Sequence, residues 1–226
     1  PAMPPTTTRV VAISGPSGTG KSTLSSILES RITSANLTCT TIHQDSYFKG
    51  PKPESYWTQE PKESPETIDM HSLHVALVAA VAEGYDVCII EGFLLLQDLP
   101  IMEEVTSVLF LHSDASTCLA RRLARSERTE HESEGLRIYF QKHVWPGYEI
   151  NTRPALQALR DRVHGDAASG RPQKKSAPET TTLVEIDGTL PLERVTSAAV
   201  DALPTLLPDV DLSRLVRDPA PSGEME

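Results

Sequence analysis

Short apolar runs alternate along the chain with longer stretches in which apolar residues recur at helical spacing. The apolar runs are rich in β-branched and aliphatic residues and end at turn-forming residues, which is typical of strands. They predict strands at 10–13, 38–43, 85–90, 107–112 and 181–186. Because these runs are nearly continuous rather than alternating, we expect the strands to be buried on both faces of the sheet.

The stretches between these runs predict helices. The expected helices cover 21–34, 70–83, 114–125, 138–163 and 190–203, with Asp114 as an N-cap and interruptions near Pro146 and Pro154. Gly84 provides a C-terminal stop for the second of them. Strands that alternate with helices predict an α/β fold with a mainly parallel five-stranded sheet and helices on both faces. Ligands of such sheets bind at the carboxyl ends of the strands.

Composition narrows the class of protein. The 226 residues are 38% hydrophobic and 23% charged, as in one globular α/β domain. No apolar run approaches about 18 residues and no signal peptide opens the chain, so we expect no membrane partner. The net charge of -10 argues against a nucleic-acid partner. Three widely spaced cysteines indicate a reducing compartment, the cytoplasm or also the nucleus.

One motif carries a specific chemical prediction. Residues 15–22, Gly-Pro-Ser-Gly-Thr-Gly-Lys-Ser, match G-x-x-x-x-G-K-[ST] in full, and they lie between the first predicted strand and the first predicted helix. Backbone N–H groups of such a loop bind phosphates, while Lys21 reaches the β- and γ-phosphates and Ser22 binds magnesium. The loop residues expected to contact ATP are Gly15, Ser17, Gly18, Thr19, Gly20, Lys21, Ser22 and Thr23. The motif predicts a P-loop NTPase-type three-layer sandwich that uses ATP and Mg²⁺.

Two carboxylates follow predicted strands and are candidates for the chemistry. Asp45 lies just beyond the second strand, where it can accept the proton of a hydroxyl that attacks the γ-phosphate. Glu91 closes the third strand, where P-loop proteins place an acid associated with magnesium. The chain has no N-K-x-D guanine motif, which argues against a GTPase, and its small size favours a metabolite kinase.

Arginines gather where the fourth helix ends. Arg121, Arg125 and Arg128 are spaced so that they share a helix face, with Arg122 beside them. A guanidinium fork suits phosphate oxygens and the charge that develops in phosphoryl transfer. We therefore expect Lys21, Arg121 and Arg125 to stabilise charge while Asp45 acts as the base.

Four further blocks carry a family resemblance. They are His-Gln-Asp-Ser-Tyr-Phe-Lys at 43–49, Ile-Ile-Glu-Gly-Phe-Leu-Leu at 89–95, Tyr-Phe followed by His-Val-Trp-Pro-Gly-Tyr within 139–148, and Asp-Gly-Thr at 187–189. Together they resemble the nicotinamide riboside kinases, within the wider uridine-kinase-like group, over about residues 9–200. The resemblance implies ATP-dependent phosphorylation of the 5′-hydroxyl of nicotinamide riboside, which gives nicotinamide mononucleotide for NAD salvage.

The resemblance also implies roles for individual residues. It places Arg121 and Arg125 near the phosphates, Asp187 and Thr189 near the adenine of ATP, and Glu91 near Mg²⁺ or the substrate. The residues expected to contact the nucleoside substrate are Asp45, Tyr47, Phe48, Tyr56, Glu63, Glu91 and Arg122. Among them, Glu63 could accept the ribose hydroxyls, and Tyr56 or else Trp57 could supply an aromatic face that the family places elsewhere.

The chain departs from the family pattern where the base is recognised. Lys62-Glu63 stands where the family has an aromatic residue followed by Asp, Glu127 replaces an aromatic residue of the lid, and Gly-Leu-Arg-Ile at 135–138 replaces Asp-Pro-Pro-Gly. Two alternatives therefore stay open: a kinase for another nucleoside such as uridine or cytidine, and a non-catalytic nucleotide-binding module. We expect a monomer or a small homo-oligomer.

The remaining segments predict the domain organisation. Residues 1–8 form a disordered lead-in whose Pro1-Ala2 resembles an expression scar, and 9–206 form one kinase domain. Within it, the Pro-rich stretch 49–65 predicts a long functional loop. Charged residues without apolar periodicity predict a lid at about 126–137, and 165–179 predict a flexible insertion. Residues 207–226 are expected to form a disordered acidic tail.

Overall fold

The computed structural model of the chain describes residues 8–49, 64–169 and 181–215. The predicted α/β fold is confirmed: five strands form one sheet in the order β2-β3-β1-β4-β5. The strands are β1 (Arg9–Ser14), β2 (Cys39–His43), β3 (Val87–Glu91), β4 (Ser107–His112) and β5 (Thr182–Asp187). Every pairing in this sheet is parallel, so the carboxyl ends of all five strands meet at one edge.

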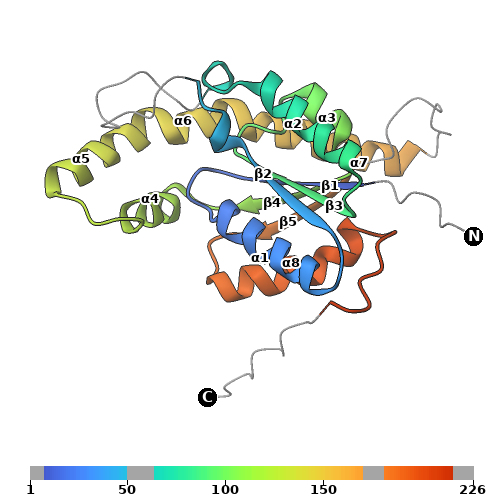
Figure 1. Cartoon of the computed structure of the whole chain (residues 1–226). Helices are drawn as coiled ribbons and strands as arrows, with labels where there is room; N and C mark the ends of the chain where they lie inside the picture. The colour runs from blue at the N-terminus through green and yellow to red at the C-terminus, as the bar shows by residue number, and fades with distance from the viewer. Residues whose placement is uncertain (1–7, 50–63, 170–180, 216–226) are drawn as a thin grey trace, which may run out of the picture.

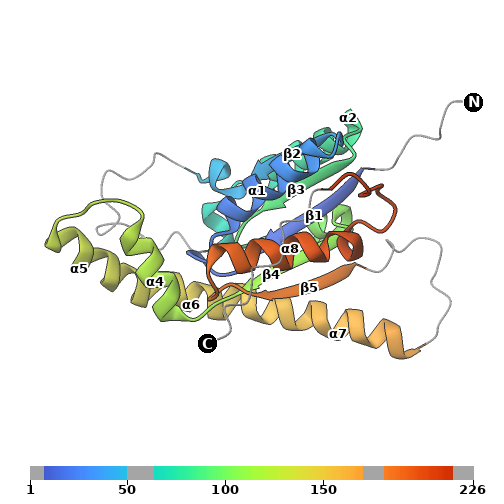
Figure 2. The ribbon, with the colours of Figure 1, turned by 90° about the horizontal axis from the view of Figure 1, so that it is seen from below.

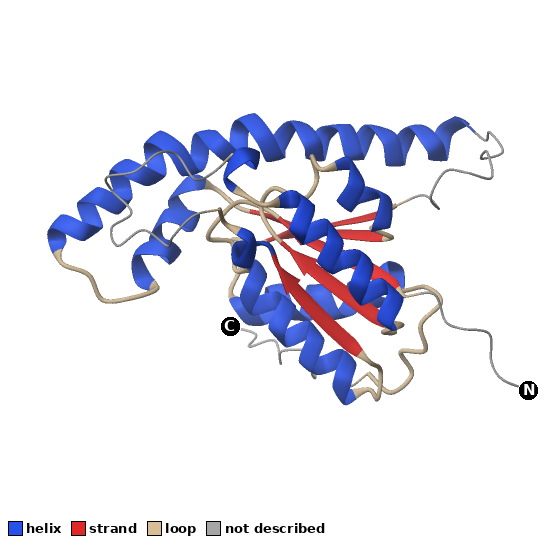
Figure 3. Cartoon of the chain, turned by 45° about the horizontal axis from the view of Figure 1, so that its top comes forward, coloured by secondary structure: helices blue, strands red, loops and turns tan. Residues whose placement is uncertain are grey.

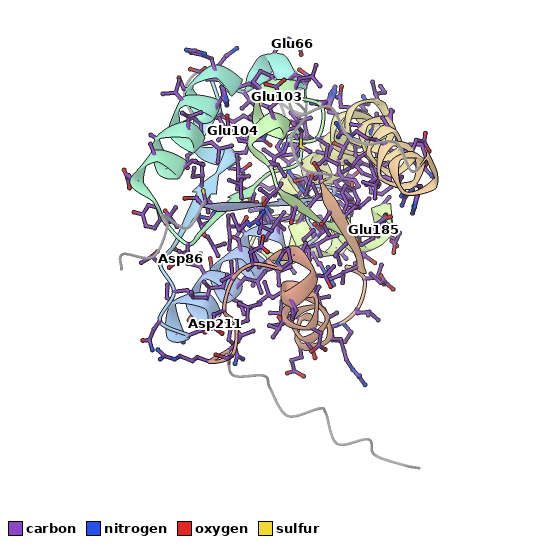
Figure 4. The ribbon with its side chains drawn as sticks, turned by 90° about the vertical axis from the view of Figure 1, so that its right-hand side faces the viewer. Glu66, Asp86, Glu103, Glu104, Glu185 and Asp211 are labelled. Atoms are coloured by element: carbon purple, nitrogen blue, oxygen red, sulfur yellow. The ribbon has the colours of Figure 1, made fainter. Side chains whose placement is uncertain are left out.

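Helices cover both faces of the sheet, as Figures 1 and 2 show. One layer holds α1 (Lys21–Ser34) and α8 (Leu192–Leu206), and the other holds α2 (Met70–Glu83), α3 (Leu99–Glu104) and α7 (Arg153–Ser169). In Figure 4, Glu103 and Glu104 mark the α2–α3 layer and Asp211 marks the opposite layer. The remaining helices are α4 (Ala115–Ala124), α5 (Glu130–Tyr139) and α6 (Trp145–Gly147), with 3₁₀ turns at Gln44–Tyr47 and Pro65–Thr67.

Each layer has its own apolar core. Leu73, Leu77 and Leu156 pack with strand residues such as Val10 and Ile90 on one face of the sheet. On the other face, the helices α1 and α8 cover the alternate positions of the same strands. Because both faces of the central strands are covered, their continuous apolar runs are fully explained by burial. No helix among the described residues is long and apolar enough to span a bilayer.

The region predicted as a lid contains a helix that the apolar pattern did not reveal. Helix α5 begins with a capping box, in which the Thr129 hydroxyl accepts a hydrogen bond from the Glu132 N–H and the Glu132 carboxylate accepts one from the Thr129 N–H. Only Leu136 and Tyr139 of this helix are buried, so few apolar positions mark it in the sequence. Helices α4 and α5 extend beyond the sheet at the left of Figure 1.

The helical path from α5 to α7 is continuous, which corrects the predicted interruptions (Figure 3). Two π-helical segments, Phe140–Val144 and Tyr148–Thr152, flank α6 instead. The wider π-type hydrogen bonding accommodates Pro146, which has no N–H to donate, while the backbone stays helical on both sides. Helix α7 also continues to Ser169, into the predicted insertion; residues 170–180 lie outside the described residues.

The predicted disordered tail is wrong for its first part. Leu207 is 1% exposed, and Val210, Leu212 and Leu215 pack against the α1–α8 core. Arg9 forms an ion pair with Asp209. Burial of these apolar side chains orders residues 207–215, which the acidic composition of the tail had obscured. The rest of the tail, 216–226, and residues 1–7 of the lead-in lie outside the described residues. Thr8, the last residue of the predicted disordered lead-in, is buried and hydrogen-bonds to the Val81 carbonyl oxygen, so the prediction is wrong at this residue.

Candidate functional site

The glycines of the P-loop are required by its shape. Gly15 and Gly18 have φ angles of 144° and 102°, which residues with a side chain rarely adopt. A Cβ on Gly15 would lie 2.4 Å from the carbonyl oxygen of Leu111, and one on Gly18 would lie 2.7 Å from that of Cys118. The loop therefore passes directly against the end of β4 and against α4, and only glycine fits at both contacts.

Lys21 and Ser22 open helix α1 and point toward the same region. The Lys21 ammonium group donates hydrogen bonds to the carbonyl oxygens of Gly15 and Pro16, both at 3.0 Å, and the residue is 7% exposed. The Ser22 hydroxyl donates to Glu91 Oε1 at 2.9 Å. A fixed ammonium group and the N-terminus of a helix thus face one point, as binding of a polyphosphate requires.

A cavity of about 270 Å³ joins the P-loop to the two carboxylates predicted from the sequence. Asp45 and Glu91 lie on its wall with Arg125 and Phe93, at the carboxyl ends of β1, β2 and β3. The loop residues on the wall are Ser17, Gly18, Gly20, Lys21, Ser22 and Thr23. The structure therefore brings together the phosphate loop, one arginine and both acids.

Asp45 is exposed at the cavity, yet the protein around it disfavours its charged form. Burial by the surrounding protein raises the pKa of its carboxyl group, and the nearby negative charge of Glu91 raises it further. Lys21, Arg125 and Arg122 act in the opposite direction. A carboxylate whose ionised form is disfavoured is a better proton acceptor than an ordinary aspartate, as a general base needs.

The donor set beside Ser22 fits a magnesium ion bound together with nucleotide phosphates. Mg²⁺ prefers oxygen ligands and usually binds through one or two protein groups plus phosphates and water. The Ser22 hydroxyl and the Glu91 carboxylate supply such oxygens at the wall of the cavity. The described residues contain no group of three His, Cys, Asp or Glu that could hold a metal alone, so the phosphates would complete the coordination.

The arginines at and beyond the end of α4 do not share one role. Helix α4 ends at Ala124, so Arg128 lies outside it, which corrects the expected common face. Arg125 lines the cavity, whereas Arg122 donates a hydrogen bond to the Ser17 hydroxyl within the P-loop. Arg128 donates to the carbonyl oxygens of Arg122, Leu123 and Ser126 and so caps the end of α4.

Arg121 binds backbone carbonyl groups on two sides. Its guanidinium donates to the carbonyl oxygen of Thr19 at 3.2 Å and to that of Gly188 at 2.5 Å. It also donates to the carbonyl oxygens of Thr189 and Leu190, at 3.3 and 3.1 Å. Arg121 therefore joins the P-loop to the turn after β5. The expected role of Arg121 near the phosphates stays a prediction.

The Asp187 side chain stabilises the turn after β5. Asp187 Oδ1 accepts hydrogen bonds from the Thr189 N–H and hydroxyl, at 2.9 and 2.6 Å, and these bonds lower the pKa of Asp187. Gly188 is required here because a Cβ would lie 2.6 Å from the carbonyl oxygen of His112. The expected contact of Asp187 and Thr189 with adenine stays a prediction.

Gln44 belongs to the site, although the sequence pattern assigned it no role. It is fully buried, and its Oε1 accepts hydrogen bonds from the Phe93 and Leu94 N–H groups at 3.0 and 3.1 Å. Gly92 leaves room for it, since a Cβ there would lie 2.6 Å from Gln44 Oε1. Gln44 thereby joins the end of β2 to the end of β3 and holds Asp45 beside Glu91. Its sequence signal is its place in the 43–49 block that carries the resemblance, directly before Asp45.

The remaining candidate substrate residues are placed in part. Tyr47 and Phe48 pack against a small apolar cluster of Ile68, Phe93 and Leu94, and the Phe48 and Phe93 rings stack with centroids 6.2 Å apart. They form an apolar wall beside the cavity that Phe93 lines. Tyr56 and Glu63 lie outside the described residues, as do Lys62 and most of the Pro-rich loop.

Trp145 and Tyr148 line a separate cavity of about 230 Å³ under helix α7. Their rings contact each other, with centroids 5.0 Å apart. Glu185, labelled on β5 in Figure 4, accepts hydrogen bonds from Arg160 at this cavity. These aromatic residues are thus packing groups of the helical layer and do not line the phosphate cavity.

Comparison with known proteins agrees with this geometry. Residues 11–139 match the family described as AAA domain (AAA_18). The chain belongs to this AAA-domain family. The matched part contains the P-loop, both carboxylates and the arginines of α4, so the domain is a P-loop nucleotide-binding domain. No curated protein matches the chain.

Solved structures resemble this AAA-domain chain at low identity. A protein described as a candidate fructose transport system kinase from Silicibacter sp. TM1040 is 21% identical, with a TM-score of 0.47 over 67% of this chain and 85% of that one. A sugar kinase from Janibacter sp. HTCC2649 is 17% identical, with a TM-score of 0.45 over 93% and 99%. A possible uridine kinase from Bacillus stearothermophilus is 16% identical, with a TM-score of 0.39 over 63% and 86%.

Proposed function

We propose that the chain transfers the γ-phosphoryl group of ATP to a hydroxyl group of a small molecule, with Mg²⁺ as cofactor. The observation that supports this most is the shared cavity of Lys21, Ser22 and Asp45. A module that only bound nucleotide would need the first two residues but no proton acceptor beside the phosphates. The sequence resemblance makes the 5′-hydroxyl of nicotinamide riboside the first candidate acceptor.

The residues of the cavity divide the work. Lys21 and the P-loop N–H groups would hold the phosphates, and Arg125 would add positive charge from the side of α4. Mg²⁺ beside Ser22 and Glu91 would supply further charge compensation. Asp45 would accept the hydroxyl proton as the acceptor oxygen bonds to the γ-phosphorus and the bond to the ADP oxygen breaks. The raised pKa of Asp45 suits this role.

Another nucleoside, such as uridine or cytidine, is the second candidate acceptor. Lys62 stands where the resembling family has an aromatic residue, and its positive charge would repel a cationic pyridinium ring. Uridine and cytidine carry no such charge at neutral pH, so the same position would not disfavour them.

The first test measures ATP consumption with nicotinamide riboside, uridine, cytidine and no acceptor, with products identified by mass. We expect one phosphorylated nucleoside and little ATP hydrolysis without acceptor. Phosphorylated uridine or cytidine alone would keep the mechanism and change the substrate. Tight ATP binding without transfer to any of them would favour the non-catalytic nucleotide-binding module.

The second test concerns the base. Asp45→Asn is expected to lower turnover at least about 100-fold and to leave ATP affinity unchanged, because the amide cannot accept the proton. Asp201→Asn, at an exposed position of α8, is the matched control and should behave as wild type. Full turnover in Asp45→Asn would show that another group acts as the base.

A further inference from the structure

His43 contacts the acid expected to lie beside magnesium. It is the last residue of β2, and it pairs directly with Glu91, the last residue of β3. Its Nδ1 lies 2.8 Å from Glu91 Oε1. The Glu91 side chain is only 4% exposed, whereas that of His43 is 41% exposed. A buried carboxylate is thus held from the solvent side by an imidazole ring.

Both hydrogen bonds to the Glu91 carboxylate are made to the same oxygen, Oε1. A carboxylate only accepts, so Nδ1 of His43 must carry the proton in this contact. The Ser22 hydroxyl donates to the same atom, Oε1, at 2.9 Å. Among the described residues, Oε2 accepts no hydrogen bond. Two donors therefore fix the orientation of the carboxylate and leave Oε2 for the cavity that Glu91 lines.

His43 is the donor that can hold this orientation when the site is occupied. Ser22 is itself expected to turn a lone pair toward magnesium, and its hydroxyl can rotate. Asp45, two residues after His43, carries a like charge close enough to Glu91 to raise the pKa of Asp45. Without His43, that repulsion would act on a Glu91 side chain held by Ser22 alone.

We propose that His43 is a positioning residue for the magnesium site, which it orients through Glu91 without touching metal or substrate. The inference rests on the proposed use of a magnesium nucleotide. Partners that orient a metal-site carboxylate or imidazole typically contribute on the order of 10-fold or more to metal affinity. This contribution should appear in metal binding itself, before any acceptor is present.

The experiment measures Mn²⁺ binding in the presence of ADP by electron paramagnetic resonance of free Mn²⁺. His43→Ala is expected to weaken Mn²⁺ binding about 10-fold. His43→Asn should restore it to within about 2-fold, because the Asn amide nitrogen can take the place of His Nδ1 as a donor. His71→Ala, at an exposed position of α2, is the matched control and should bind as wild type. ADP affinity without metal should be the same in all four proteins.

Three results would overturn the proposal. Wild-type Mn²⁺ affinity in His43→Ala would show that Ser22 alone orients Glu91. Equal weakening in His43→Ala and His43→Asn would show that the ring acts by packing. Because no acceptor is needed, failure of the acceptor panel leaves this test intact. A wild-type protein whose ADP complex binds no Mn²⁺ would overturn both this proposal and the magnesium chemistry on which it rests.

Discussion

Gln44→Leu should reveal how strongly the end of β2 is tied to the end of β3. The substitution keeps a side chain of similar size but removes the Oε1 acceptor of two backbone N–H groups. Those groups belong to Phe93 and Leu94, which are 8% and 1% exposed, so water cannot replace the lost acceptor without rearrangement. Gln44 also donates to the Met70 sulfur at 3.7 Å, a weaker contact.

The magnitude follows from the two orphaned donors. Each buried N–H left without a partner costs about 1–3 kcal/mol, which gives a range of about 2–6 kcal/mol. Partial relaxation of the loop after β3 favours the lower half, so we expect the free energy of unfolding to fall by about 3 kcal/mol. That corresponds to roughly two powers of ten in the unfolding equilibrium constant.

Urea unfolding followed by far-UV circular dichroism measures this loss. The midpoint should decrease while the slope with denaturant stays constant. Gln157→Leu is the matched control, because Gln157 is exposed on α7 and makes only solvent-exposed hydrogen bonds; its effect should stay within about 0.5 kcal/mol. A loss below about 1 kcal/mol in Gln44→Leu would refute the role of Gln44 as the link between the two strands.

Three further predictions concern the same region. Gly18→Ala should lose nucleotide binding in an equilibrium titration, since its Cβ would lie 2.7 Å from the Cys118 carbonyl oxygen; Gly84→Ala, also at positive φ but with open space, should cost only about 1 kcal/mol of stability. Arg121→Ala should lower the free energy of unfolding by about 2 kcal/mol through loss of charged hydrogen bonds to backbone carbonyls, and an unchanged midpoint in urea would contradict this. Folding raises the pKa of Asp45. The contribution of the Asp45 side chain to stability is therefore fully present below its pKa in the unfolded chain, and it is lost as pH rises through its pKa in the folded protein. Asp45→Asn should therefore be more stable than wild type near pH 7 and equal to it below about pH 4. A variant that is less stable at pH 7 would show that the folded protein does not disfavour the ionised carboxylate.

Local sequence patterns were sufficient to predict those features whose physical cause lies within a short stretch of chain. The P-loop is a contiguous motif whose glycines, lysine and serine act within eight residues, so its position and chemistry follow from the sequence. Asp45 and Glu91 could be placed at the same edge of the sheet, because Asp45 lies just beyond one strand, Glu91 closes another, and parallel strands end at one edge. The departure from the resembling family at Lys62-Glu63 is visible only in the sequence, because these two residues lie outside the described residues.

Long-range contacts were decided by the tertiary structure. Gln44 and His43 looked like ordinary members of a motif, because their partners lie 48–50 residues away on the neighbouring strand. The shared helical spacing of Arg121 and Arg125 predicted a shared role, yet the carbonyl groups of a distant turn bind Arg121 and leave Arg125 at the cavity. Helical periodicity reports which face a residue occupies, whereas the partner on that face depends on how the sheet brings separate segments together.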